Sequence, residues 1–366
     1  MTSRRDFLRN TVVGGALLGA VRPISAMERL AGPTQAPLDL LILGGTGFIG
    51  PHLVRHAVER GHRVTIFTRG RRAADLPDSV IRLTGDRNGQ LGALEGKRWD
   101  VVIDDSATDP DWVRQSTALL RSSVSSYLFT SSTGVYYPYL KRGVDESVQP
   151  HLEIVDPKDG SESYGVQKAQ SEQVVLKAFG NRGLVVRPAY IIGPGDTTDR
   201  FPYWPQRLER GGETLAPGRP DDRIAIIDVR DLAAFMVKLV EDRQGGVYNT
   251  FGPRTPMSFG EFLDRSVAAL SSNAKLVWVD DHALLREHGI FGSVPWIMLD
   301  GNNFGHTHIQ NGRAMAAGLT IRPLEQTVRD ALAWWHTVPA ERTAKPRFAI
   351  TDEKEAAVLA AWRARR

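Results

Sequence analysis

A glycine-rich turn, GGTGFIG at residues 44–50, constrains the fold of this chain more than any other feature. It follows an apolar run typical of a buried parallel strand and precedes a helical pattern that extends to about Arg60. Gly44 permits the tight turn, Gly47 lets the backbone approach a pyrophosphate, and Gly50 lets the helix pack close to the strand. The free amides at the helix start favour an anion. We therefore predict a dinucleotide site, whose loop residues are Gly44, Gly45, Thr46, Gly47, Phe48, Ile49 and Gly50.

Apolar runs and helical patterns then alternate along the chain. This alternation predicts an α/β fold, a doubly wound parallel Rossmann sheet, over residues 38–195 and again over 226–252. The expected strands lie in 63–70, 79–86, 100–106, 125–132, 183–190 and 245–252. The expected helices lie around 90–96, 109–121, 161–180 and 228–242.

The composition changes at Gly193, where Pro, Gly, Asp, Arg and aromatic residues become frequent. We interpret this stretch as loop structure beside a substrate and not as core. Residues 196–225 and 253–336 are expected to form a smaller C-terminal substrate-binding cap, with an amphipathic helix at 322–335. Residues 337–366 are expected to form a tail with one more helix.

The turn after the second expected strand selects among dinucleotides. NAD sites usually carry Asp or Glu there, to hold the ribose hydroxyls. Here the strand ends TRGRR, and Arg69 and Arg72 suit a 2′-phosphate. We favour NADP as the cofactor, with NAD as the alternative if this turn is only a solvated basic surface. Asp86, after the third strand, is placed to contact the adenine amino group.

The reactive pair is in YGVQK, which places Tyr164 and Lys168 on one face of a helix. A phenol with an unperturbed pKa of about 10 is a poor base at neutral pH. A nearby ammonium group and the positive nicotinamide would lower that pKa. Tyr164 could then exchange a proton with a substrate oxygen while hydride moves to or from the nicotinamide.

Together, GGTGFIG, SSTGVY at 131–136, YGVQK and RPAYIIGPGD at 187–196 resemble the extended short-chain dehydrogenase/reductase family, the NAD-dependent epimerase/dehydratase group. The resemblance covers roughly residues 38–336. It implies that Ser132 hydrogen-bonds the substrate oxygen, with Thr133 beside it. It also implies that Lys168 touches the nicotinamide ribose and that the Pro188 loop packs against the nicotinamide. Ser106 keeps the turn after the fourth strand small beside the cofactor.

Two departures from the family pattern bear on the substrate. Asp104 and Asp105 stand where the family often has uncharged residues. Arg223 lies one residue out of register with an arginine that grips the diphosphate in nucleotide-sugar enzymes, which argues against such a substrate.

Several side chains are candidates for substrate contact. The candidates are Thr133, Asp196, Tyr203, Trp204 and Arg223. Tyr203 and Trp204 could stack on a sugar or an aromatic ring, or could only anchor the cap. His52 and His56 lack a third ligand, so we expect no metal site.

The N-terminal stretch SRRDFLRNTVVGGALLGAV resembles a twin-arginine export signal. We expect residues 1–26 to be the signal, with cleavage after ISA, and 27–37 to be a linker. The apolar segment is too short to span a bilayer, so no stable membrane anchor is expected. The protein would be exported folded by the twin-arginine translocation machinery and would be periplasmic or extracellular. The absence of cysteine suits an oxidising compartment.

Most of the formal net charge of +4 lies in residues 1–26, so charge gives no case for nucleic-acid binding. The leading hypothesis is a sugar-type epimerase or dehydratase acting on a small molecule with a tightly held cofactor, because dinucleotides are scarce outside the cytoplasm. The alternatives are an NADPH-dependent reductase of a ketone or enone, and a non-catalytic nucleotide-binding protein. The helices at 109–121 and 161–180 often pair in dimers of this family, so a homodimer is one expected assembly.

Overall fold

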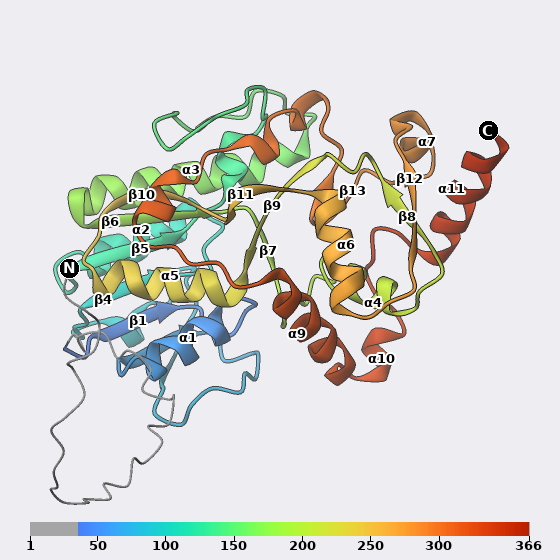
Figure 1. The fold of residues 1–366 in the computed structure, drawn as a ribbon. Helices are drawn as coiled ribbons and strands as arrows, with labels where there is room; N and C mark the ends of the chain where they lie inside the picture. Colours follow the sequence, from blue (N-terminus) through green and yellow to red (C-terminus); the bar gives the residue numbers. More distant parts are fainter. Residues whose placement is uncertain (1–35, 366) are drawn as a thin grey trace, which may run out of the picture. The chain divides into compact units, whose positions relative to one another are not determined.

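A seven-stranded parallel sheet organises the N-terminal part of the molecule (Figure 1). The computed structural model describes residues 36–365. The strand order is β10-β6-β5-β4-β1-β2-β3, so the order reverses between β1 and β4, where ligands bind in doubly wound sheets. The predicted fold class is confirmed. The strands are β1 Asp39–Leu43, β2 Arg63–Thr68, β3 Ile81–Thr84, β4 Val101–Asp104, β5 Ser126–Thr130, β6 Gly183–Pro188 and β10 Gly246–Thr250.

Helices cover both faces of this sheet. Helices α1 (Gly50–Glu59) and α5 (Val229–Glu241) lie side by side on one face, and α2 (Pro110–Leu120) and α3 (Gly160–Phe179) on the other (Figure 1). Strand β1 shows why its sequence is continuously apolar. Leu40 and Ile42 belong to the core under α1 and α5, whereas Leu41 and Leu43 belong to the core under α2 and α3.

The helix expected around 90–96 is reduced to a single 3-10 turn, η1 (Gly92–Leu94). Two other short 3-10 segments, η2 (Thr133–Tyr136) and η3 (Gly180–Arg182), follow β5 and α3. The remaining expected helices and strands of this part are present with ends shifted by a few residues.

The C-terminal part has smaller sheets and a hydrophobic core of its own. One sheet has the order β11-β9-β7, a second pairs β12 with β8, and a hairpin pairs β13 with β14. The strands are β7 Tyr190–Ile192, β8 Glu213–Pro217, β9 Arg223–Asp228, β11 Gly252–Ser258, β12 Lys275–Val279, β13 Gly292–Ser293 and β14 Trp296–Ile297. The helices are α4 Tyr203–Glu209, α6 Phe259–Ala269, α7 His282–Glu287, α8 Gly312–Ala316, α9 Leu324–Thr337, α10 Ala340–Thr343 and α11 Asp352–Ala364, with 3-10 turns η4 Gly301–Asn303 and η5 His306–His308.

The stretch after Gly193, expected to be loop and not core, is in large part core. Phe201, Trp204, Leu208 and Leu215 are fully buried, on or beside α4 and β8. The aromatic and proline residues that suggested a loop are packed inward because a small cap must bury large side chains to gain stability.

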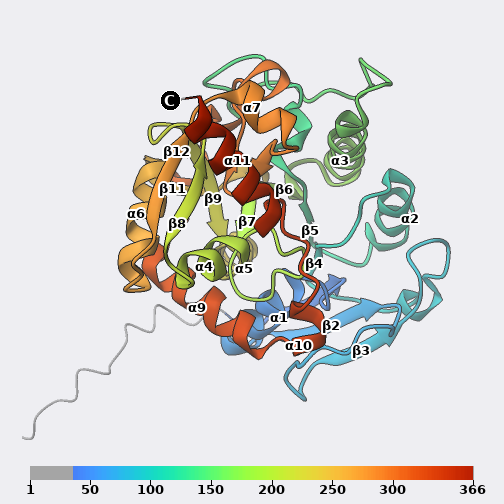
Figure 2. The ribbon, with the colours of Figure 1, turned by 90° about the vertical axis from the view of Figure 1, so that its right-hand side faces the viewer.

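The expected tail contains α10 and α11, and α11 packs into this second core. Figure 2 shows α11 beside β8 and α9 beside α4. Val358 is fully buried, and the Glu355 carboxylate pairs with Arg207 and accepts the backbone amide of Leu215 at 2.7 Å. One face of α11 is therefore part of the cap's core, so the helix is not an appendage.

The expected export signal, residues 1–26, and nearly all of the expected linker lie outside the described residues. Within residues 36–365, no helix is both long enough and apolar enough to cross a bilayer.

Candidate active site

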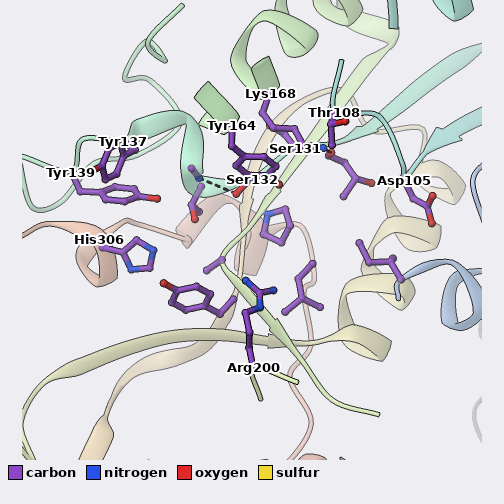
Figure 3. Close-up of a pocket in the computed structure, with 18 of the residues that line it drawn as sticks. Asp105, Thr108, Ser131, Ser132, Tyr137, Tyr139, Tyr164, Lys168, Arg200 and His306 are labelled. Atoms are coloured by element: carbon purple, nitrogen blue, oxygen red, sulfur yellow. Dashed lines mark hydrogen bonds between the residues drawn. The ribbon is translucent and has the colours of Figure 1, made fainter. Parts of the chain in front are cut away.

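A cleft with two adjoining halves lies at the carboxyl ends of the sheet strands. The glycine-loop half, with a volume of about 610 Å³, is lined by Gly44, residues 46–49, Arg69, Arg72 and Asp86. The tyrosine half, about 550 Å³, is lined by Ser132, Thr133, Tyr164, Lys168 and Pro188 (Figure 3). Both halves are lined by the seam residues, which are Ile49, Asp105, Ser106, Ile191 and Arg200.

The glycine loop fits the backbone of an anionic ligand. Gly44 and Gly45 have φ angles of +122° and +93°, which side-chain-bearing residues rarely adopt. A Cβ on Gly50 would collide with the backbone of Gly45, so glycine is required where α1 packs on the loop. No heavy atom lies within 4 Å of where a Cβ of Gly47 would stand, which leaves room for a close-lying ligand. The expected roles of these glycines therefore have a geometric basis.

Arg69, Arg72 and Asp86 lie at the far end of the glycine-loop half. Within the described part of the chain, neither Arg69 nor Arg72 forms an ion pair. Asp86 accepts the amide of Asn88 at 3.0 Å in the turn after β3. The exposed guanidinium groups are available to a phosphate, as the sequence predicts.

Ser132, Tyr164 and Lys168 meet in the tyrosine half. Ser132 follows β5 and caps η2, and its hydroxyl accepts the amide of Gly134 at 3.0 Å. Tyr164, on the first turns of α3, lines the same half, and its interaction with the Ser132 side chain acts to lower the pKa of the phenol. Lys168 lies one turn later, and its Nζ donates to the carbonyls of Ala107 at 2.7 Å and Thr130 at 2.8 Å. Glycine at 165 allows α3 to pack closely against η2, because a Cβ there would collide with the Gly134 carbonyl.

Burial controls the proton affinities of this pair. Desolvation raises the pKa of Tyr164, while the interaction with Ser132 and the charge of Arg200 oppose that rise. Desolvation lowers the pKa of Lys168 to about 8, although Asp104 and Asp105 act in the opposite direction. The Lys168 ammonium lies 4.9 Å from the Phe129 ring centroid and 5.9 Å from that of Tyr164. In the protein alone the phenol is therefore protonated at neutral pH.

The two aspartates that depart from the family pattern have different surroundings. Asp104 is buried and forms a bidentate ion pair with Arg87 at 2.5 and 2.7 Å, and it also accepts the Tyr127 hydroxyl. Asp105 accepts the backbone amide of Gly45. Burial, reinforced by the charge of Asp104, raises the pKa of Asp105 to about 7. The carboxyl group at the seam thus titrates near neutrality.

An aromatic and polar wall, not foreseen from the sequence, faces Tyr164 across the tyrosine half. It consists of Tyr137, Tyr139, Tyr190 and His306 (Figure 3). The His306 ring lies 4.6 Å from that of Tyr139 and 5.1 Å from that of Tyr190, measured between centroids. Burial lowers the pKa of His306 to about 4, so the imidazole is neutral at pH 7. Within residues 36–365, its buried Nδ1 has no hydrogen-bond partner.

Of the expected substrate contacts, the structure places Thr133 in the tyrosine half and the others outside it. Thr133 lines the tyrosine half and hydrogen-bonds the side chain of Tyr139. Tyr203 and Trp204 line neither half, because both are buried in the second core, where the Trp204 indole donates to the Ser293 carbonyl at 3.3 Å. Their anchoring role prevails, and their assignment as substrate contacts is wrong.

Asp196 and Arg223 line neither half of the cleft. Asp196 is fully buried and organises a turn, since its carboxylate accepts the amides of Thr198 and Phe201. Arg223 begins β9, and burial together with the charge of Arg142 lowers the pKa of its guanidinium. Neither side chain therefore belongs to the group of residues around Tyr164.

His52 forms a structural contact and not a metal site. Its Nε2 hydrogen-bonds the Pro194 carbonyl at 2.9 Å, which ties α1 to the loop after β7. Among the described residues, no group of three or more His, Cys, Asp or Glu side chains is gathered closely enough to hold a metal ion.

A sequence model of the NAD-dependent epimerase/dehydratase family matches residues 40–108 and 113–250, which include the glycine loop, Ser132, Tyr164 and Lys168. The chain belongs to this family. Its members and structural neighbours are epimerases, dehydratases and reductases. The predicted family is thereby confirmed.

Individual relatives are distant. Chloroplast stem-loop binding protein of 41 kDa b from Arabidopsis thaliana is 28% identical over 235 residues, and the match spans 59% of each chain. The enzyme WbmH of Bordetella bronchiseptica, solved with NAD⁺, is 18% identical with a TM-score of 0.60, covering 83% of this chain and 99% of that one. RMD of Pseudomonas aeruginosa, solved with NADPH, is 19% identical with a TM-score of 0.53, covering 81% and 99%. The two solved structures show that the fold is shared.

Proposed function

We propose that this protein is an NADP-dependent epimerase or dehydratase that acts at a secondary alcohol carbon of a small, sugar-type substrate. The pairing of Tyr164 with Ser132, with Lys168 one turn away, is the observation that carries the proposal. This group lies in the half of the cleft that adjoins the glycine loop. A proton-transfer residue therefore stands next to a site shaped for a dinucleotide.

The cofactor would be held by residues from both halves. The glycine loop would take the phosphates, Asp86 the adenine, and Ser106, Lys168 and Pro188 the nicotinamide end. When bound, the nicotinamide supplies a reversible hydride acceptor. The exposed guanidinium groups of Arg69 and Arg72 favour NADP over NAD.

The chain's own residues would handle the proton. Ser132 donates a hydrogen bond to the substrate oxygen, and Tyr164 gives or takes the proton at that oxygen. The Lys168 ammonium, fixed by two carbonyls, keeps a positive charge close to the phenol and lowers the cost of its ionisation.

The aromatic wall favours a ring that carries hydroxyl groups. Aromatic faces pack against the C–H surface of such a ring, and the neutral His306 and the tyrosine hydroxyls can hydrogen-bond its substituents. Tyr203 and Trp204, which the sequence offers as stacking partners of a substrate, are buried in the second core, and Arg223 lines neither half of the cleft. A free sugar or polyol is therefore favoured over a nucleotide-sugar.

The twin-arginine-like N-terminus supports an exported, periplasmic or extracellular enzyme. A redox-neutral reaction suits that setting, because no second substrate is needed to restore the cofactor. An NADPH-dependent ketone reductase is the second candidate, favoured by Arg69 and Arg72.

Nucleotide analysis of the purified full chain tests the proposal. We expect denaturation to release NADP, and we expect candidate sugars to change configuration without net change in NADPH absorbance. Tyr164→Phe should lower turnover by about 10³-fold while nucleotide content stays the same. Stoichiometric NADPH consumption would support the reductase instead. Unchanged turnover in the variant would refute the assigned role of Tyr164.

A further inference from the structure

Arg200 occupies a special place in the cleft. Of the five seam residues, which line both halves, it is the only one with a positive charge. It lies in the loop between β7 and α4, and Figure 3 shows its guanidinium directed into the pocket. The sequence analysis did not single it out.

The seam is where the bridging part of a dinucleotide must lie. If adenosine occupies the glycine-loop half and nicotinamide lies beside Tyr164, the pyrophosphate that joins them crosses between Ile49 and Arg200. The glycine loop and the start of α1 offer backbone amides from one side. Arg200 offers a guanidinium from the side of the cap.

The Arg200 charge is free to meet an anion. Its Nε donates to the Thr198 hydroxyl at 3.0 Å, and within residues 36–365 its guanidinium forms no ion pair. The charge is nonetheless felt at the Tyr164 and Tyr190 hydroxyls. The second charged seam residue, Asp105, is engaged by the Gly45 amide. A planar guanidinium suits two oxygens of a diphosphate at once.

The C-terminal tail fixes the residue that precedes Arg200. Asp199 has a φ of +63° and is fully buried. Its carboxylate accepts the Arg342 guanidinium at 2.6 Å and the Arg347 backbone amide at 2.8 Å. A left-handed aspartate needs such support, because its conformation is unfavourable by itself. The tail thus sets the direction in which the chain leaves Asp199 and Arg200 enters the seam.

We propose that Arg200 binds the pyrophosphate of the dinucleotide from the cap side, and that Arg342, acting through Asp199, is a positioning residue for it. This proposal rests on the nucleotide site of the proposed function. It makes the retention of cofactor a joint property of the glycine loop and the cap.

Binding of nucleotide fragments by the full chain tests the proposal without any need for the substrate. ADP-ribose contains the pyrophosphate, whereas 5′-AMP contains only the adenosine phosphate. Calorimetry should show that Arg200→Ala weakens ADP-ribose binding by roughly 10- to 100-fold and 5′-AMP binding by less than about 3-fold. Arg200→Lys should recover part of the loss. Arg121→Ala, which removes an exposed arginine at the end of α2, should change neither affinity.

Several outcomes would overturn the assignment. Unchanged ADP-ribose affinity in Arg200→Ala, with tight binding by the wild type, would show that Arg200 does not touch the pyrophosphate. An equal loss for both fragments would indicate a general disturbance of the site. If the wild-type chain binds neither fragment, the nucleotide site of the proposed function fails as well.

The positioning role has its own readout. Arg342→Ala should weaken ADP-ribose binding by about 3- to 10-fold and leave 5′-AMP binding unchanged, and Arg342→Lys should restore part of the affinity. Lys345→Ala, an exposed change in the same segment, should leave both affinities alone. A wild-type ratio of the two affinities in Arg342→Ala would remove Arg342 from the proposal.

Discussion

The N-terminal and C-terminal parts of the molecule bury the same kind of ion pair in different ways. In the N-terminal part, Arg87 and Asp104 are 17 residues apart, and Glu172 and Arg187 are 15 apart. In the C-terminal part, Arg207 and Glu355 are separated by 148 residues. The first part is assembled from successive strand–helix units, whereas the second depends on segments distant in sequence. The contacts inside the C-terminal part therefore form only when segments far apart in the sequence have folded together.

The two halves of the cleft show the same difference. The glycine loop and its arginines come from one continuous stretch, residues 44–72, whereas the tyrosine half combines both parts. Tyr164 comes from α3, but Arg200 and His306 come from the C-terminal part. In the proposed function, the residues for the cofactor's adenosine end are thus locally determined, whereas those for the substrate depend on tertiary packing.

The largest expected effect tests whether the long-range pair holds the C-terminal core together. Glu355→Ala leaves the Arg207 guanidinium buried without its carboxylate and also removes the acceptor of the Leu215 amide. We expect the free energy of unfolding to fall by about 3–5 kcal/mol, measured by urea denaturation. Glu353→Ala on the exposed side of α11 is the matched control and should change it little. Equal effects would mean that the tail is not integral to the cap.

A second prediction concerns a carboxyl group in the N-terminal part that lacks a local partner such as Arg87. The pKa of Asp105 is about 7 in the folded chain, whereas an unperturbed aspartate, as in the unfolded chain, has a pKa of 3.8. Between these values only the folded state keeps the proton, so the stability contributed by this group falls as the pH rises.

Asp105→Asn should abolish this dependence, since the amide does not titrate. From pH 4.5 to 8, the variant should gain stability relative to the wild type by about 3 kcal/mol, with the change complete near pH 8. Urea midpoints at a series of pH values provide the measurement. A difference that stays constant with pH would contradict the buried, protonated state of Asp105.

The smallest expected effect concerns the locally encoded arginines. Replacing Arg69 and Arg72 together by alanine should weaken the binding of adenosine 2′,5′-bisphosphate by about 10-fold, or ~1.4 kcal/mol. The effect is small because both guanidinium groups are exposed and their charges are screened by solvent. Binding of 5′-AMP, which lacks the 2′-phosphate, is the internal control and should stay the same. An unchanged ratio would favour NAD as the cofactor.

The N-terminal fold and the reactive residues could be predicted because the information is local. Buried parallel strands are apolar on both faces, and GGTGFIG and YGVQK each fix their own geometry within one strand–helix connection. Ser132, Tyr164 and Lys168 accordingly come together as expected.

The C-terminal part could not be predicted in this way. Trp204 was placed at the substrate because aromatic residues among prolines and glycines suggested a loop, yet its contacts come from Ser293 and Phe259 far along the chain. Arg200 and His306 lie near no motif that marks them, apart from the HTH triplet around His306. Their roles depend on which strands and turns the cap places beside Tyr164.

The anchoring of Asp199 by Arg342 has a practical consequence. A premature stop codon before α10 would delete the support of the residue next to the cleft, so loss of the last coding segment should act like a lesion in the ligand site. Fusions and purification handles at the carboxyl end deserve the same care as substitutions beside the reacting groups.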